Sequence, residues 1–121
     1  MPKGTITHIE FPADDLGRAK QFYEAVAGWE FGPMEGFPDY LLFRSEEGHG
    51  GGLGTRGESV GTTIRVYITV DKLEDAVAAA EANGGTVTSP PQDVPGQGRF
   101  AAVKDPEGSE IGLWENLPGD A

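Results

Sequence analysis

The sequence predicts an α+β fold of two tandem βαβββ modules, which form a curved mixed sheet around a cup. The chain has 121 residues, enough for one domain but too few for two independent cores. Strand-like and helix-like segments follow the same order in both halves. The halves also align at an offset of 57 residues through the first strand and helix, which pairs Asp14 with Asp71 and Gly28 with Gly85, and at an offset of 60 through the later strands. We therefore expect one domain, 1–121, with modules 1–57 and 58–121.

The first half begins with an alternating β-rich strand at residues 5–11, TITHIEF. An amphipathic helix follows in DDLGRAKQFYEAVAG, where Asp14 or Asp15 can cap the N-terminus and Gly28 can end the helix. The remaining elements are a short WEF strand, a Pro/Gly loop at 32–38, the strand DYLLFRS and the glycine-dense GHGGGLGT, expected as an irregular or bulged strand.

The second half repeats this order. TIRVYITV is a strand, and DKLEDAVAAAEANGG is a helix that Asp71 caps and Gly84-Gly85 ends. After a short TVT strand we expect a Pro-rich loop, SPPQDVPGQG. The strands RFAAVK and EIGLWE, joined by the turn DPEG, complete the module.

Composition excludes several classes of function. The net charge of -11, from 20 acidic and 9 basic residues, repels phosphate backbones and anionic lipids, so we expect no nucleic-acid and no membrane partner. No apolar run approaches the roughly 20 residues that span a bilayer, and the start MPKGTITHIEF does not resemble a secretion signal. We expect a cytoplasmic protein. Without cysteine, any metal must be held by Asp, Glu, His8 or His49.

Strand alternation predicts which side chains face the cup. The predicted set contains one imidazole, one guanidinium, two carboxylates and several aromatic rings. His8 and Arg65 are the candidate catalytic residues, since an imidazole can act as a general base near neutral pH. The candidate ligand-binding residues are Glu10, Tyr40, Gly52, Tyr67, Phe100, Gly112 and Trp114. Each also has a structural interpretation: an ion pair of Arg65 with Glu10 or Glu110, a hydrogen-bonded His8, and aromatic rings that fill the core.

The segments THIEFPADDLGRAKQFYEAVAGWEF, VYITVDKLEDAV and DPEGSEIGLWE together resemble the vicinal oxygen chelate superfamily. This superfamily includes glyoxalase I, extradiol dioxygenases, fosfomycin-resistance enzymes and bleomycin-binding proteins. The resemblance covers nearly the whole chain. It implies two βαβββ modules around a cup, frequent homodimers, and in many members a divalent metal held by His and Glu.

The resemblance places the four metal-ligand positions at His8, Gly52, Arg65 and Gly112. Only His8 can bind a metal, and a permanently charged guanidinium repels a cation. We therefore predict a cup without metal or other cofactor, in which Gly52 and Gly112 leave space where relatives carry side chains. Two alternatives remain: carboxylates from shifted registers, namely Glu10, Glu110 or Glu115, and His49 from the glycine-rich strand.

Three functions follow from these observations. The first is a protein that binds a small molecule without metal, as bleomycin-binding proteins do. The second is an enzyme of the lactoylglutathione lyase or dioxygenase type, metal-dependent or using His8 and Arg65. The third is a non-catalytic interaction module whose cup is filled by its own side chains. We also expect a homodimer, and a charge-assisted contact of Arg65 with Glu10, Glu110 or an anionic ligand.

Overall fold

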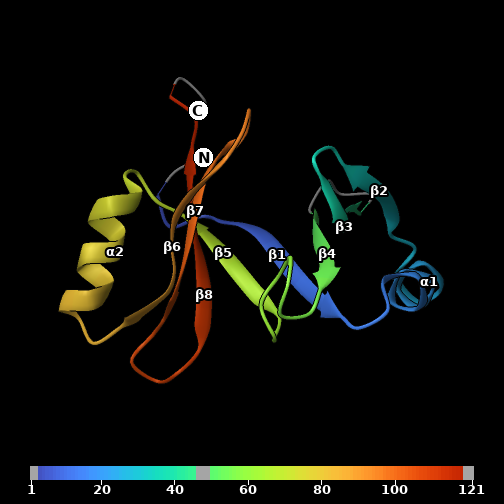
Figure 1. The fold of residues 1–121 in the computed structure, drawn as a ribbon, viewed down its shortest axis with the longest axis horizontal. Coiled ribbons are helices and arrows are strands. Elements are labelled where there is room, and N and C mark those ends of the chain that lie inside the picture. The colour runs from blue at the N-terminus through green and yellow to red at the C-terminus, as the bar shows by residue number, and fades with distance from the viewer. Residues whose placement is uncertain (1–2, 46–49, 119–121) are drawn as a thin grey trace. The chain divides into compact units, whose positions relative to one another are not determined.

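The computed structural model describes residues 3–45 and 50–118 (Figure 1). Within these ranges the chain forms two helices and eight strands in the order β1, α1, β2, β3, β4, β5, α2, β6, β7, β8. It divides into two compact units, an N-terminal unit of His8–Arg65 and a C-terminal unit made of the described parts of Met1–Thr7 and Val66–Ala121. The predicted α+β class with two βαβββ modules is confirmed by this element order.

The N-terminal unit orders its strands β2-β3-β4-β1. The β2–β3 and β3–β4 pairs are antiparallel, and β4 runs parallel to β1. Helix α1 begins as predicted, because the Asp15 side chain accepts a hydrogen bond from the Arg18 backbone N–H at 2.9 Å. Gly28 ends it in the left-handed region, at φ 69°. The elements are β1 (Ile6–Ala13), α1 (Leu16–Ala27), β2 (Glu30–Met34), β3 (Phe37–Arg44) and β4 (Gly50–Thr55).

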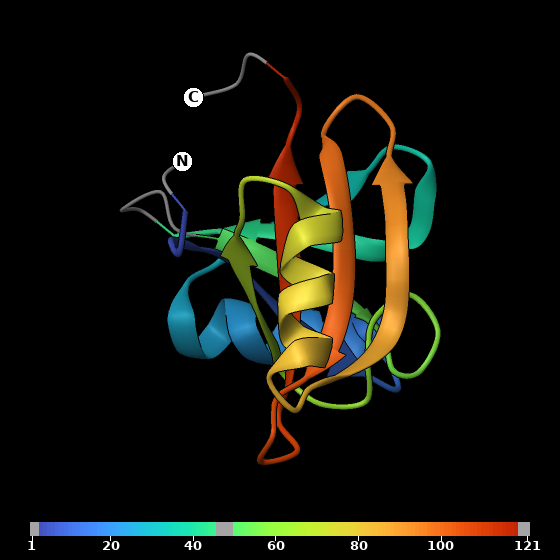
Figure 2. The same ribbon diagram turned by 90° about the vertical axis from the view of Figure 1, so that its left-hand side faces the viewer.

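The C-terminal unit repeats this arrangement, with β6-β7-β8-β5 as its strand order. Its β6–β7 and β7–β8 pairs are antiparallel and its β5–β8 pair is parallel, as in the N-terminal unit. Helix α2 lies over one face of β8, β7 and β6 (Figures 1 and 2). The elements are β5 (Arg65–Thr69), whose first residue Arg65 belongs to the N-terminal unit, α2 (Leu73–Ala82), β6 (Thr86–Val94), β7 (Gly98–Lys104) and β8 (Glu110–Asn116).

The two units have chemically different cores. In the N-terminal unit Trp29 stacks on Phe43 with ring centroids 4.1 Å apart and also on Tyr23, and Phe11 packs tilted or edge-on beside them. In the C-terminal unit the core is aliphatic. Its fully or nearly buried members are Leu73, Ala101, Val103 and Leu113. Both cores lie on the helix-facing side of their strands, so the opposite face of each sheet is left for a site.

Three sequence expectations need correction. Asp71 does not cap α2: the N-cap residue is Lys72, and no side chain of its own makes the cap bond. The Pro-rich segment 89–98 is not a loop throughout, because β6 continues to Val94 with two register shifts. The Pro/Gly loop at 32–38 likewise contains the end of β2 and the start of β3. β2 and β6 are the outermost strands of their units, and their prolines lie at register shifts, where proline is tolerated.

No helix in residues 3–45 and 50–118 is both long and apolar enough to cross a membrane.

Candidate functional site

A line of four polar side chains crosses the N-terminal unit. His8 Nε2 lies 2.6 Å from the hydroxyl of Tyr40, and that hydroxyl donates to Glu10 Oε2 at 2.9 Å. The other carboxylate oxygen of Glu10 lies 3.6 Å from Nη1 of Arg65. Glu10, Tyr40 and Arg65 are each less than one-tenth exposed. The structure thus brings both candidate catalytic residues together with two of the candidate ligand-binding residues.

Strand alternation explains how β1 contributes two members of this line. His8 and Glu10 are two residues apart, so their side chains leave the same face of β1, opposite to Phe11 in the aromatic core. Arg65 begins β5 and is buried beside Glu10. This ion pair is one of the contacts that the sequence led us to expect for Arg65.

Tyr40 reaches the line from β3 by crossing over β4. Register pairs Tyr40 with Gly54, and Gly52 with Glu10, so β4 lies between the tyrosine and the β1 residues. A Cβ atom built on Gly52 would overlap the Tyr40 hydroxyl, and one on Gly54 would lie 3.2 Å from the ring. The tyrosine ring therefore lies against a strand face that carries no side chains.

The hydrogen bonds determine where the protons lie. Tyr40 has one hydroxyl proton, which it gives to Glu10, so His8 must donate its Nε2–H to the tyrosine oxygen. Burial lowers the pKa of His8 from 6.5 to about 4, and the ring is neutral near pH 7. The line therefore consists of a neutral imidazole, a neutral phenol, a carboxylate and a guanidinium, with no net charge.

The remaining candidate ligand-binding residues lie in the C-terminal unit. A Cβ atom on Gly112 would overlap the ring of Tyr67, its register partner on β5. Tyr67 meets Phe100 edge-on, with ring centroids 6.3 Å apart. Trp114 covers Gly98, and its indole N–H donates to Asn116 Oδ1 at 2.9 Å. Tyr67 and Phe100 thus form an aromatic pair, and the Tyr67 ring covers Gly112.

The expectation of open space at Gly52 and Gly112 is wrong. Tyr40 covers Gly52 within the N-terminal unit, and Tyr67 covers Gly112 within the C-terminal unit. The physical reason is that a glycine face lets a neighbouring side chain lie flat on the strand. The sequence did carry a signal for the first contact, since Gly50, Gly52 and Gly54 alternate along one face of β4.

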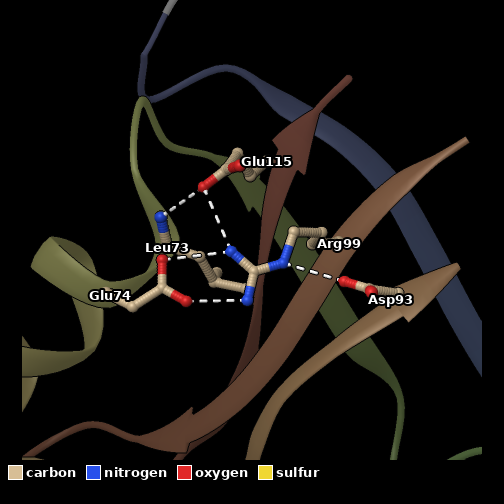
Figure 3. A network of polar contacts seen from close by, with 5 residues as sticks. All are labelled: Leu73, Glu74, Asp93, Arg99 and Glu115. Carbon is tan, nitrogen blue, oxygen red and sulfur yellow. Dashed lines mark hydrogen bonds and ion pairs between the residues drawn. The ribbon is translucent and has the colours of Figure 1, made fainter. Parts of the chain in front are cut away.

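Sequence reasoning missed an ionic network around Arg99 in the C-terminal unit (Figure 3). Arg99 donates twice to Glu74, at 3.0 and 2.7 Å, and once to Asp93 at 3.0 Å. The hydrogen bond from Arg99 lowers the pKa of Glu74. Glu115 lies 3.9 Å from Arg99 and accepts the backbone N–H of Leu73 at 2.7 Å. This network ties the start of α2 to β6, β7 and β8.

The residues at the four expected ligand positions do not fit a divalent metal. In the N-terminal unit Arg65 places a fixed positive charge beside Glu10, and Tyr40 covers Gly52. In the C-terminal unit Gly112 lies under Tyr67. Across the described parts of the chain, no three His, Asp or Glu side chains gather as a metal site would require. His49, the histidine alternative, lies outside the described residues.

The carboxylates considered as shifted ligands have other partners. Glu110 accepts a hydrogen bond from Thr88 Oγ1 at 2.6 Å. Glu115 points to the helix face, toward α2, as its strand parity relative to Gly112 predicts (Figure 3). Glu10 belongs to the His8–Tyr40 line.

Comparison with solved structures defines the fold class. A hypothetical protein from Bacillus halodurans superposes with a TM-score of 0.73 at 13% identity, covering 99% of both chains. The Mn(II)-bound glyoxalase from Novosphingobium aromaticivorans gives 0.65 at 22% identity, covering 95% of this chain and 40% of that one. Both likenesses are in the fold, which is the glyoxalase-like fold.

Sequence comparison then assigns the family. The family model for the Glyoxalase/Bleomycin resistance protein/Dioxygenase superfamily matches residues 5–113, so the chain belongs to this superfamily. The resemblance inferred from the motifs is confirmed. The chain is also 32% identical over 118 residues to the protein named "Putative glyoxylase CFP32" of Mycobacterium tuberculosis, covering 95% of this chain and 45% of that protein. It thus spans just under half of this curated relative.

Proposed function

We propose that this protein binds a small organic molecule at a site centred on His8, Glu10 and Tyr40, without a divalent cation. The observation that carries the proposal is the direct link between these three groups, with Tyr40 covering the expected ligand position Gly52. The bleomycin-binding branch of the superfamily offers a precedent for sequestering a ligand without converting it. A carrier or sequestering role is the function that this chemistry supports best.

Elemental analysis tests the metal-free part of the proposal. Protein purified from medium supplemented with Ni, Zn, Mn and Fe should carry well under one equivalent of these metals in total. The physical reason is that His8 is the sole donor among the four expected positions, beside the guanidinium of Arg65. Stoichiometric metal that disappears in the His8→Gln variant would contradict the proposal.

Native mass spectrometry and calorimetry test the binding part. Native spectra of the same preparation should show the chain with an organic adduct, or without adduct if the ligand is lost during purification. Titration with bleomycin and with lactoylglutathione, each in the presence of a chelator, probes saturable binding. Tyr40→Phe should weaken such binding, whereas Tyr23→Phe, in the aromatic core, should leave it unchanged. A chain that binds neither probe and no cellular metabolite would favour an interaction module.

A second candidate is a lyase or isomerase of the glyoxalase type, which one contact favours. His8 and Tyr40 form a short imidazole–phenol hydrogen bond at 2.6 Å, the kind of pair that can move a proton. The relative named as a glyoxylase points in the same direction. Consumption of lactoylglutathione distinguishes the two functions: an enzyme consumes it and loses this activity in His8→Gln, whereas a binding protein becomes saturated without consuming it.

A further inference from the structure

We infer that Tyr40 is the positioning residue for His8 and Glu10: its hydroxyl holds both side chains, and the Arg65 guanidinium compensates the charge of Glu10. This inference deepens the proposed metal-free function and rests on it. It assigns Tyr40 a specific role, which is to hold the imidazole and the carboxylate in one fixed geometry.

The first step is the glycine face of β4. Gly50, Gly52 and Gly54 alternate along the strand and share one face, while Leu53 on the other face is 1% exposed in the core. Glycine weakens a strand and is typical of places where another group approaches the backbone closely. Here that group is the Tyr40 ring, which would collide with a Cβ atom on Gly52.

The second step is the reach of Tyr40. Neighbouring strands are about 4.8 Å apart, so β3 and β1 are separated by about 10 Å across β4. A tyrosine on β3 spans much of that distance only if it lies flat across β4. The glycine face permits this, and the hydroxyl arrives within hydrogen-bond distance of both His8 and Glu10.

The third step is that Tyr40 and Arg65 have different roles. The Tyr40 hydroxyl holds the imidazole and the carboxylate together by accepting from His8 Nε2 and donating to Glu10 Oε2. Arg65, 3.6 Å from Glu10 and equally buried, compensates the charge.

The C-terminal unit provides an independent parallel. There the expected ligand position Gly112 is also covered by a tyrosine ring, that of Tyr67. Tyr67 reaches it from the neighbouring strand, as its register partner, rather than across a strand. Each unit thus has glycine at an expected ligand position, and in each unit a tyrosine ring covers that glycine.

The test is the state of the His8 ring in the full chain, read by long-range ¹⁵N–¹H NMR. The chain has two histidines, so the His8→Gln variant assigns the signal. Wild-type His8 should show a protonated Nε2 that is protected from solvent. Tyr40→Phe keeps the ring but removes the hydroxyl, and Gly52→Ala displaces the hydroxyl; each should speed exchange of the Nε2 proton about tenfold.

Two matched controls and a fold check complete the experiment. Gly32→Ala places a methyl on β2 where nothing lies within 4 Å, and Tyr23→Phe removes a hydroxyl from the core, so both should leave the His8 signal unchanged. Backbone NMR spectra verify the fold of each variant. If either Tyr40→Phe or Gly52→Ala folds and keeps the protected Nε2–H, the inference is overturned. Failure of the proposed function would instead appear in elemental analysis and ligand titration, which this readout does not use.

Discussion

At Glu10 a hydroxyl and a guanidinium approach different oxygens of one buried carboxylate. Tyr40 donates to one oxygen, and Arg65 faces the other at 3.6 Å. Because water is largely excluded, the carboxylate depends on these partners for its charge compensation. Removing one member of the Arg65–Glu10 ion pair should therefore destabilise the fold more than the pair itself stabilises it.

Replacing Arg65 tests this dependence. Arg65→Met should lower the free energy of unfolding by about 3 kcal/mol, because it removes a buried guanidinium from beside a buried carboxylate. The double variant Arg65→Met/Glu10→Gln should recover part of that loss, since the uncompensated charge is gone. Urea denaturation at pH 7 measures both. The control is Arg56→Met: its ion pair with Asp14 is exposed, and its loss should cost no more than about 1 kcal/mol.

The lowered pKa of His8 predicts how acid affects stability. The pKa is about 4 in the fold and 6.5 when the chain is unfolded, so the unfolded chain binds more protons between these values. Stability from the buried neutral ring is complete above pH 6.5 and declines as the pH falls toward 4. The melting temperature of wild type should therefore drop more between pH 7 and 4.5 than that of His8→Gln. Parallel drops in the two proteins would contradict the assignment.

At the scale of the elements, the two helices begin in different ways although their sequences look alike. Asp15 caps α1 with its own side chain, as its position predicts. The start of α2 is capped from a distant strand, because Glu115 on β8 accepts the Leu73 backbone N–H (Figure 3). Arg99 holds Glu115 and Glu74 in place around this helix start.

Paired substitutions test the two candidate caps of α2. Glu115→Ala should cost about 1 to 2 kcal/mol of unfolding free energy, because the backbone N–H of the buried Leu73 loses its hydrogen-bond acceptor. Asp71→Ala should stay within about 0.5 kcal/mol, since Asp71 is an exposed residue that makes no cap bond. Amide hydrogen exchange of the first turn of α2 should quicken in the first variant and not in the second.

Local sequence patterns were sufficient to predict the helices, the strands and the faces of the strands. They were not sufficient to predict side-chain contacts between strands. Alternation placed His8 and Glu10 on one face of β1, and capping chemistry located Gly28 and Asp15. The path of Tyr40 over β4 depends on sheet register and on two glycines, Gly52 and Gly54, acting together, which no single position reveals. The cap from Glu115 likewise depends on tertiary packing. Pro90 and Pro91 led us to predict a loop where the structure has β6. An outermost strand tolerates proline, but the sequence alone does not show which strands are outermost.

At the scale of the whole molecule, the outermost strand of each unit contains proline. β2 carries Pro33, and β6 carries Pro90 and Pro91. Proline lacks a backbone N–H, and these prolines lie at register shifts of their strands; both features oppose extension of the sheet by another chain. We therefore expect any association to use faces rather than these strands, and the charge of -11 per chain adds repulsion that salt reduces.

These features lead to a prediction about assembly. We expect a homodimer, so sedimentation velocity at tens of micromolar protein should give about twice 12.8 kDa, and the dimer fraction should grow as NaCl screens the acidic charge. Replacing Pro33 and Pro90 by threonine restores two backbone donors on the outermost strands, and this variant should form species larger than a dimer. A matched Pro118→Thr variant, changed outside any strand, should sediment like wild type. A mass near that of one chain at all salt concentrations would contradict the dimer. A proline variant that stays dimeric would show instead that features other than proline protect these strands.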